Sequence, residues 1–528
     1  MKNMTLEHIA AVCGGTYIGN EADKTREIQG AVIDSRLVEK DYLFIPVRGE
    51  KVDGHSFIPS VFEKGALAVF SEEKLENPAG PYILVENTLD AMKKIAADYR
   101  RGLDIKVVGI TGSVGKTSTK EMIASVLAQK YNVLKTEGNL NNEIGLPLTI
   151  FKIREEHQVA VLEMGISEFG EMHRLAEMAQ PDICVITNIG LCHLENLITR
   201  DGILKAKTES FEHLAPDGIA VLNGADDKLC DKKMVNGRPA VFYGIGQEAK
   251  TAETETGSKR LAEKEVYATD VEAIGLEGTK AVIHTPEQQF EVVIPIAGEH
   301  NVYNALAAVC VARRLGLDAE EMKLGIEHAH TIGGRSNLIR KNGITIIDDC
   351  YNANPVSMMA SIDVLSQAKG RKIAVLGDMG ELGSEEKKLH GMVGTHFAGK
   401  KIDALFVTGT LAGEIAEEAR RVAPETRVYA EPDKEALAQA RAGETIATLG
   451  HLIHNESYNE GLRRRGHAGE RQQPRAVLHR RGQPGHSDAH QHLQRRHRRG
   501  QEALYDGRRH LCPPLPLCRQ LRPRAHRH

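Results

Sequence analysis

Short apolar runs alternate with amphipathic stretches over most of the chain, which predicts alternating strands and helices. The clearest case starts at residue 105, where the apolar run IKVVGIT leads into a glycine-rich loop. The segment TSTKEMIASVLAQKY follows, and its apolar residues recur at helical spacing. Apolar runs of this length between helical patterns are typical of a doubly wound parallel sheet. The strands expected in the first two hundred residues are 42–47, 66–70, 82–85, 105–111, 159–164 and 183–190.

The pattern changes twice before residue 447. The stretch around 250–295 resembles antiparallel strands, and a helix is expected over 301–317. From about residue 333 strand and helix patterns alternate again, which predicts a second, smaller doubly wound unit. We therefore expect an α/β protein with domains at 1–100, 101–332 and 333–447. The strands expected in the last of these domains are 343–348, 372–378, 404–409 and 426–430.

Beyond residue 447 the apolar periodicity disappears, and residues 448–528 are rich in Arg, His, Gln and Pro. Residues 451–528 hold 17 Arg and no Lys against 6 acidic residues, a net charge of +11, whereas 51 basic and 66 acidic residues give the rest of the chain −15. This composition favours a disordered or mistranslated tail over an arm that binds nucleic acid. Codons able to encode HLIHNES can, read one base later, encode Ser-Tyr-Thr-Met-Lys, which indicates a frameshift.

Composition narrows the class of protein further. The 528 residues are 41% hydrophobic and 27% charged, which excludes a collagen-like or wholly disordered chain. No stretch approaches the roughly 18 consecutive apolar residues that a membrane span needs, and the N-terminus lacks the long apolar core of a signal peptide. Eight scattered cysteines without a CxxC pair suit a reducing compartment. We therefore expect a cytoplasmic protein with no membrane span.

Residues 109–118, GITGSVGKTS, form the strongest local motif. They depart at one position from the phosphate-loop pattern GxxxxGK[ST], because Ile110 stands where that pattern has glycine. Backbone N–H groups would face phosphate oxygens, Lys116 would reach the β and γ phosphates, and Thr117 would offer its hydroxyl to Mg²⁺. The lysine favours an ATP site over a dinucleotide site. The expected phosphate-binding residues are Gly112, Ser113, Val114, Gly115, Lys116, Thr117 and Ser118.

Other chemistry-bearing residues follow expected strands. Glu163 ends one strand of the central sheet and could hold Mg²⁺, and His193 follows another. Taken alone, each is as well explained as a surface or structural residue, but together with the phosphate loop they favour a metal site. In the last domain, DDCYNANP at 348–355 and LGDMGELG at 376–383 follow two strands. These two segments suit either substrate contacts or ordinary turns.

With these motifs in place, residues 1 to about 447 closely resemble the Mur ligases, ATP-dependent amide-bond synthetases that build the peptide stem of cell-wall peptidoglycan precursors. The resemblance implies a small N-terminal domain for the UDP-sugar, a central ATP-binding domain and a C-terminal Rossmann-like domain. It also implies ATP and two Mg²⁺ ions as cofactors, and a monomer. The motifs that carry it are GITGSVGKTSTK, LEMG, TNIGLCHLE, AKTE, GEHNVYNALAA, GGRSN and DDCYNANPVSM.

Within the family, YNANPVSM and GDMGELG resemble the ligases that add D-alanyl-D-alanine. The resemblance then implies that ATP phosphorylates the carboxylate of UDP-N-acetylmuramoyl-tripeptide and that the dipeptide amine attacks the acyl phosphate. Alternatives are a Mur ligase for a single amino acid or a folylpolyglutamate synthetase. A different class of protein, one that binds nucleic acid through its tail, is disfavoured. The third residue of the tripeptide stays open between meso-diaminopimelate and L-lysine.

The resemblance also assigns roles to residues by motif position. One Mg²⁺ falls to Thr117 and Glu163, and the second to Glu163, His193 and Lys207, with Lys207 carbamylated. Adenine falls to Asn301 and Asn304, the phosphates to Arg335 and the ribose to Asp349. The loop residues Asn139, Asn141 and Asn142 are expected near the acyl phosphate, where Asn142 would be catalytic. The expected substrate contacts are Ser35, Arg36, Asp53 and His55 for the UDP-sugar and Asn352 and Asn354 for the dipeptide.

Overall fold

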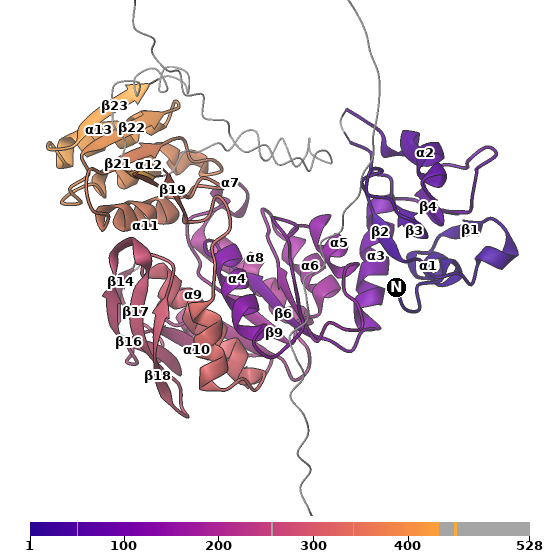
Figure 1. Ribbon diagram of the computed structural model, residues 1–528, viewed down its shortest axis with the longest axis horizontal. Coiled ribbons are helices and arrows are strands. Elements are labelled where there is room, and N and C mark those ends of the chain that lie inside the picture. Colours follow the sequence, from indigo (N-terminus) through magenta and orange to yellow (C-terminus); the bar gives the residue numbers. More distant parts are fainter. Residues whose placement is uncertain (50, 255–256, 342, 432–447, 451–528) are drawn as a thin grey trace, which may run out of the picture. The chain divides into compact units, whose positions relative to one another are not determined.

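The computed structural model describes residues 1–49, 51–254, 257–341, 343–431 and 448–450 and shows an α/β protein with three main sheets (Figure 1). The predicted character of residues 451–528 lies outside these described residues. Within the described part of the chain, no helix has both the length and the apolar composition needed to cross a membrane.

The first sheet has five strands in the order β1-β5-β4-β3-β2, and the strands predicted within 42–47, 66–70 and 82–85 are its β3, β4 and β5. Both of its faces are buried. Leu43 and Ile83 belong to one apolar cluster, while Phe44 and Val69 belong to another. Its elements are α1 (Leu6–Cys13), β1 (Thr16–Ile18), η1 (Glu21–Asp23), β2 (Gly30–Val32), β3 (Tyr42–Phe44), η2 (Gly54–Phe57), α2 (Ile58–Glu63), β4 (Ala68–Ser71), β5 (Tyr82–Leu84) and α3 (Thr88–Arg101).

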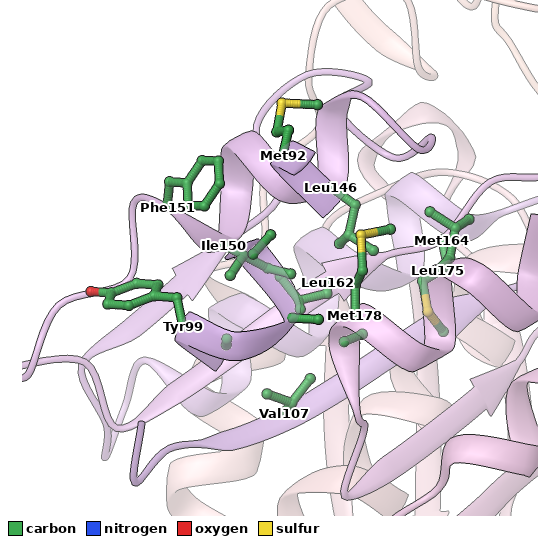
Figure 2. Close-up of a cluster of buried hydrophobic side chains, with 14 of the residues drawn as sticks. Met92, Tyr99, Val107, Leu146, Ile150, Phe151, Leu162, Met164, Leu175 and Met178 are labelled. Carbon is green, nitrogen blue, oxygen red and sulfur yellow. The ribbon is translucent and has the colours of Figure 1, made fainter. Parts of the chain in front are cut away.

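Helix α3 joins the first part of the chain to the central sheet. Met92 and Tyr99 on α3 lie in one cluster with Val107 of strand β6 and with side chains of helices α5 and α6 (Figure 2). The Tyr99 hydroxyl donates a hydrogen bond of 2.7 Å to the carbonyl of Ile153. The apolar core is therefore continuous between the N-terminal and central parts of the chain.

The central sheet has nine strands in the order β18-β17-β16-β13-β10-β9-β6-β8-β7. Across this sheet, neighbouring strands from β7 as far as β16 pair in parallel, whereas β16, β17 and β18 pair antiparallel. Strands β14 and β15 also pair antiparallel, which confirms the strand type predicted for 250–295. Strand β6 lies between β8 and β9. The chain therefore adds β7 and β8 on one side of β6 and then β9 and β10 on the other. Ligands bind at such switch points, outside the carboxyl ends of the strands.

Helices cover both faces of this sheet. Helices α4, α9 and α10 pack together on one face, and α3, α5 and α6 lie on the other. The elements up to β10 are β6 (Lys106–Thr111), α4 (Lys116–Leu127), β7 (Val133–Lys135), α5 (Gly145–Ile150), β8 (Val159–Glu163), α6 (Glu171–Ala179), β9 (Ile183–Ile186), α7 (Leu194–Leu197), α8 (Arg200–Thr208), η3 (Glu209–His213) and β10 (Ile219–Asn223). The later ones are η4 (Leu229–Asp231), β11 (Met234–Val235), β12 (Arg238–Pro239), β13 (Val241–Ile245), β14 (Thr251–Thr254), β15 (Gly257–Arg260), β16 (Val266–Ala273), η5 (Gly275–Glu277), β17 (Thr279–His284), β18 (Gln289–Ile294), α9 (His300–Arg314) and α10 (Ala319–Glu327).

The third sheet has the order β19-β20-β24-β21-β22-β23, and it is parallel except for β19. Strand β24 follows the predicted domain end at 447 and pairs with β20 on one side and β21 on the other, so the sheet extends to Gly450. The elements are β19 (Asn337–Lys341), β20 (Ile344–Asp348), α11 (Pro355–Ser366), β21 (Ile373–Leu376), η6 (Gly383–Glu385), α12 (Glu386–Thr395), β22 (Ala404–Thr408), α13 (Ala412–Val422), β23 (Arg427–Glu431) and β24 (Thr448–Gly450).

The central place of β24 makes a first prediction. Leu449 is opposite Ile346 in one neighbouring strand and Ile373 in the other. Proline at this position removes a backbone donor from a central strand, where proline is not tolerated. We expect Leu449→Pro to lower the thermal midpoint of the C-terminal domain by several degrees, measured by calorimetry. Leu449→Ala keeps the N–H and serves as the control, and equal midpoints for the two variants would contradict the pairing of β24.

Candidate active site

The predicted phosphate loop connects β6 to α4 and is fastened to the segment that follows β9. Gly112 and Gly115 have φ angles of 148° and 83°, and Gly115 is the N-cap of α4. The amides of Ser113 and Val114 donate hydrogen bonds of 3.0 Å to the backbone and side-chain oxygens of Asn188. The first turn of α4 presents N–H groups that no carbonyl within the helix can satisfy. The loop and helix start thus form an anion-binding cradle.

Lys116 lies at the start of α4, where its Nζ donates a hydrogen bond of 2.9 Å to the carbonyl of Gly112. The ammonium group is therefore already beside the loop that its sequence position predicts. Ser113 is buried, and its hydroxyl accepts a hydrogen bond of 2.9 Å from the amide of Gly190. These contacts fasten the loop to its own first residues and to the segment that follows β9.

Gly112 gives a second prediction. A Cβ atom at this position would lie 1.9 Å from Thr187 Oγ1, and the φ angle of 148° is one that other residues rarely adopt. We expect Gly112→Ala to displace the loop and weaken nucleotide binding at least about 100-fold, which is roughly 2.7 kcal/mol. Titration with a fluorescent ATP analogue measures the change. Gly138→Ala, also at positive φ but with open space around its Cβ, is the control.

Glu163 lies at the end of β8, beside the phosphate loop, and is fully enclosed. Its Oε1 accepts hydrogen bonds from Thr117 Oγ1 at 3.2 Å and from Asn141 Nδ2 at 2.7 Å. Three of the predicted site residues, from positions up to 46 residues apart, therefore meet at one carboxylate. Hydroxyl and carboxylate oxygens are the ligands that Mg²⁺ prefers.

Lys120 is a site residue that sequence reasoning missed. Its side chain is completely buried, and its Nζ donates a hydrogen bond of 2.6 Å to the carbonyl of Thr136. The same Nζ lies 3.0 Å from Glu121 Oε1 and 3.8 Å from Glu163 Oε2. A buried lysine needs such anionic partners. The available signal was a lysine on the face of α4 that the helical periodicity assigns to the core.

Lys207 is buried at the end of α8, and its Nζ has no hydrogen-bond partner. Burial, with a further contribution from the charge of Lys116, lowers the pKa of Lys207 from its usual 10.5 to about 8. His193 adopts the left-handed conformation, with φ of 52°, before α7. Its Nδ1 lies 2.5 Å from Glu381 Oε2, although the pair is not aligned as a hydrogen bond.

Unpartnered buried atoms concentrate among the predicted site residues. In the described part of the chain, six buried side-chain atoms lack a hydrogen-bond partner, and four of them are Glu163 Oε2, His193 Nδ1, Lys207 Nζ and Arg335 Nε. Such atoms are rare in folded proteins and call for an explanation, such as an ion or ligand. The oxygen and nitrogen donors of Glu163 and His193 fit Mg²⁺ ligation, whereas the Lys207 amine fits it only after conversion to an anion.

Asn301, predicted for adenine, and Arg335, predicted for the phosphates, line one small pocket together with Ser118. Ser118 lies on α4 and Asn301 on α9, two helices that cover the central sheet. Arg335 lies just before β19, a strand of the third sheet. Asn304 joins them indirectly, because its Nδ2 donates to Asn301 Oδ1 at 2.9 Å and its Oδ1 accepts from Thr119 Oγ1 at 2.8 Å. The structure thus brings together residues that are 217 positions apart in the sequence, counting from 118 to 335.

Arg335 and Asp349 are fixed by different means. The Arg335 guanidinium lies 3.9 Å from the centre of the Tyr351 ring, a cation–π contact. Asp349 accepts hydrogen bonds from the amide of Ser336, at 3.0 Å, and from the hydroxyl of Ser361. The carboxylate therefore anchors the loop that carries Arg335, so its predicted contact with ribose stays a prediction.

Several predicted polar residues serve as local caps. Asn142 Oδ1 accepts hydrogen bonds from the amides of Ile144 and Gly145 at the start of α5. Asn354 caps α11 through a reciprocal pair of hydrogen bonds with Ser357. Asn139 lies next to the cap formed by Asn142, since its carbonyl accepts a hydrogen bond of 2.7 Å from the amide of Asn141. The catalytic role predicted for Asn142 and the substrate role predicted for Asn354 remain untested.

Asp378, in the 376–383 segment, contacts a distant part of the chain. It accepts hydrogen bonds from the amides of Thr410, Leu411 and Ala412 and so caps the start of α13. This cap is neither a local turn nor a substrate contact, the two alternatives left by the sequence. In the 348–355 segment, the Asn352 side chain accepts a hydrogen bond of 2.9 Å from the amide of Ala353.

The four residues predicted for the UDP-sugar form contacts around the first sheet. Asp53 Oδ1 accepts hydrogen bonds from the backbone and the ring of His55, and Arg48 lies 3.4 Å from its other oxygen. Partial burial opposes ionisation of Asp53, but these hydrogen bonds outweigh it and lower the pKa. Arg36 pairs with Asp34, and the carbonyl of the buried Ser35 accepts from Lys64. No contact described for these four residues joins them to the phosphate loop.

Comparison with known proteins agrees with this site. Three models of the Mur ligases match the chain: the family's catalytic domain at 27–100, its middle domain at 110–312 and its glutamate ligase domain at 334–452. The chain is 38% identical over 445 residues, 83% of its length and 93% of the relative's, to the UDP-N-acetylmuramoyl-tripeptide--D-alanyl-D-alanine ligase of Bacillus subtilis. The Escherichia coli protein of the same name is 32% identical over 410 residues, 78% of this chain and 86% of its own.

Solved structures give the same result. A crystal structure of MurF from Acinetobacter baumannii matches with a TM-score of 0.74 and 31% identity, covering 88% of this chain and 99% of that one. MurF from Thermotoga maritima in complex with ADP matches with a TM-score of 0.68 and 29% identity, over 81% of this chain and 94% of that one. The fold, the phosphate loop with its buried carboxylate and these similarities together establish that the chain belongs to the Mur ligase family.

Proposed function

We propose that this protein joins D-alanyl-D-alanine to UDP-N-acetylmuramoyl-tripeptide, with ATP forming an acyl phosphate on the tripeptide carboxylate. The observation that carries the proposal is that buried atoms of Glu163, His193 and Lys207, in the domain of the phosphate loop, lack a hydrogen-bond partner. Relatives that bear the name of this activity cover nearly the whole chain before the tail. Because the reaction consumes ATP and a UDP-linked precursor, we assign it to the cytoplasm.

The residues present suit phosphoryl transfer to a carboxylate. Negative charge gathers where the γ-phosphate meets the substrate anion, so the Lys116 ammonium and the N–H groups at the start of α4 would stabilise it. Thr117 and Glu163 would hold one Mg²⁺, and Glu163, His193 and Lys207 the second. Mg²⁺ ions at these positions would neutralise phosphate charge as transfer proceeds. The buried Lys120 ammonium, 3.8 Å from Glu163 Oε2, would help to hold this carboxylate in place.

Lys207 would act as a carbamate. Its lowered pKa leaves about a tenth of the amine neutral at pH 7, and a neutral amine can attack the carbon of CO₂. The new N–C bond forms as one C=O π pair moves to oxygen, and the nitrogen loses a proton to solvent. The product is an anion in place of a cation. That exchange would explain how a lysine at this buried position could ligate Mg²⁺ with Glu163.

The remaining substrate assignments are also proposals. Asn301 and Asn304 would face adenine, Arg335 the phosphates and Asp349 the ribose. Ser35, Arg36, Asp53 and His55 would meet the UDP-sugar, and Asn139, Asn141 and Asn142 would lie near the acyl phosphate. Asn352 and Asn354 would receive the dipeptide. The protein would act as a monomer.

Phosphate release tests the assignment. The purified chain is incubated with ATP, Mg²⁺ and UDP-N-acetylmuramoyl-tripeptide, and each of several amines is added in turn. We expect release to require D-alanyl-D-alanine and to yield the pentapeptide by mass spectrometry. Release with a single amino acid instead would favour the other Mur ligases, and release with a folate and glutamate would favour the folylpolyglutamate synthetases. Parallel assays with meso-diaminopimelate and L-lysine tripeptides identify the third residue.

A further inference from the structure

Two histidines and a glutamate converge on the surface formed by α6 and η3, outside the residues assigned to ligation. His173 Nδ1 lies 2.7 Å from Glu212 Oε2 and 3.4 Å from His213 Nε2. One ligand atom from each of the three residues lies within 4.8 Å of the other two, and the cluster contains no ion. Among the residues that the structure describes, these three form the one group of three or more His, Cys, Asp and Glu side chains whose ligand atoms lie close enough to hold a metal ion.

Hydrogen bonds account poorly for this arrangement. If His173 Nδ1 carries a proton and donates it to Glu212, it has no lone pair left for His213. His213 Nε2 could then approach only as a second acceptor of the same proton. The two rings meet edge to face, with centres 4.5 Å apart and planes at 69°. A cation at the meeting point would instead be bound by a lone pair from each of the three residues.

The backbone of both elements is fixed independently of these side chains. Glu209 accepts hydrogen bonds from the amides of Gly170 and His173, at 3.2 and 3.3 Å, and so caps the start of α6. In η3, Phe211 directly precedes Glu212 and is buried in the core, and its carbonyl accepts a hydrogen bond of 2.7 Å from Asn236 Nδ2. The ligand atoms therefore sit on a pre-organised scaffold, which is what a specific site requires.

We propose that His173, Glu212 and His213 bind a divalent transition-metal ion, with Zn²⁺ the best match. Two imidazole nitrogens and one carboxylate oxygen are a ligand set typical of zinc, with a fourth tetrahedral position open to water. With two imidazole nitrogens and one carboxylate, this ligand set favours a transition metal over Mg²⁺ more strongly than the oxygen-rich set proposed for the ATP reaction.

A residue-resolved experiment is needed, because residues 451–528 contain 11 of the 23 histidines and would bind zinc as well. The full chain is treated with diethylpyrocarbonate with and without Zn²⁺, and modification of each histidine is followed by peptide mass spectrometry. We expect Zn²⁺ in the micromolar range to slow modification of His173 and His213 about tenfold, with one shared midpoint. Mg²⁺ at the same concentrations should have no effect.

His8 is the internal control, because it also pairs with a carboxylate, Asp98, at 2.7 Å but has no third ligand. Its modification should not respond to Zn²⁺. The variant His213→Ala should abolish the zinc protection of His173, and Glu212→Gln should raise the midpoint at least tenfold. Glu63→Gln, an exposed change on α2, should leave it unaltered. The proposal would be overturned if Zn²⁺ did not slow the modification of His173 in the unaltered chain. It would also be overturned if Zn²⁺ still protected His173 in the His213→Ala variant.

Discussion

Lys116→Ala is expected to abolish ligation while the protein stays folded. Removing one preorganised donor from a site of developing charge typically lowers the rate 10²- to 10³-fold. Lys116 also supplies a full positive charge beside the phosphate loop, so we expect a loss of at least about 1,000-fold in kcat/KM. The Nζ makes one hydrogen bond, to the carbonyl of Gly112. Its loss should change the thermal midpoint by no more than a few degrees.

The measurement pairs D-alanyl-D-alanine-dependent phosphate release with calorimetry on the same sample. Lys152→Ala is the matched control, because it removes an exposed lysine whose partner is a surface glutamate. Such surface pairs contribute about 0–1 kcal/mol, so Lys152→Ala should keep both activity and stability. Dipeptide-dependent phosphate release retained by Lys116→Ala would refute the ATP-site assignment.

Lys207→Met should separate activity from stability. We expect ligation to fall about 1,000-fold, because one proposed ligand of the second Mg²⁺ is lost. We expect resistance to denaturant at pH 7 to rise, because methionine fills a similar volume without a buried amine. This combination, with lower activity and higher stability, is characteristic of residues that are kept for function.

The pH dependence follows from the lowered pKa of Lys207. In the unfolded chain this lysine binds a proton below about pH 10.5, whereas in the folded protein it does so only below about pH 8. Stability is therefore lost as pH falls from 10.5 to 8, and the full cost, on the order of 3 kcal/mol, applies below pH 8. The advantage of Lys207→Met over the parent should be largest at pH 7 and shrink toward pH 10.5.

Urea denaturation in CO₂-free buffer at both pH values measures this difference. Lys205→Met, two residues away on the same helix, is the control and should show neither effect. In CO₂-equilibrated buffer, intact mass spectrometry under gentle conditions should detect a carbamate on the parent and not on Lys207→Met. An unchanged urea midpoint for Lys207→Met at pH 7 would contradict the unfavourable burial of the amine.

Local pattern was enough to predict the elements and the phosphate loop. Strand β6, the loop and α4 occupy one continuous segment, so apolar spacing and two glycines specify them together. The strand-end position of Glu163 was also visible, because parallel strands present their carboxyl ends at one edge. Helix ends were less well predicted, since α4 ends at Leu127 rather than at residue 131.

Polar residues were predicted by type, but their partners were not. Asn142, Asn354 and Asp378 all cap helices, and that use is indistinguishable in sequence from a substrate contact. Lys120 was missed for the opposite reason. A lysine is usually exposed, and only the approach of Thr136 and Glu163 from distant segments gives it a buried anionic environment.

By itself, the sequence determined the strands, the helices, the phosphate loop and the family resemblance, because each depends on residues near one another in the chain or on motif spacing. Only the tertiary structure decided that β24 lies between β20 and β21. It also decided that Thr117 and Asn141 both donate hydrogen bonds to the carboxylate of Glu163. It also decided that Lys207 is buried and has its pKa lowered. Burial and partner identity arise from segments brought together by strand order and packing, and no local pattern encodes them.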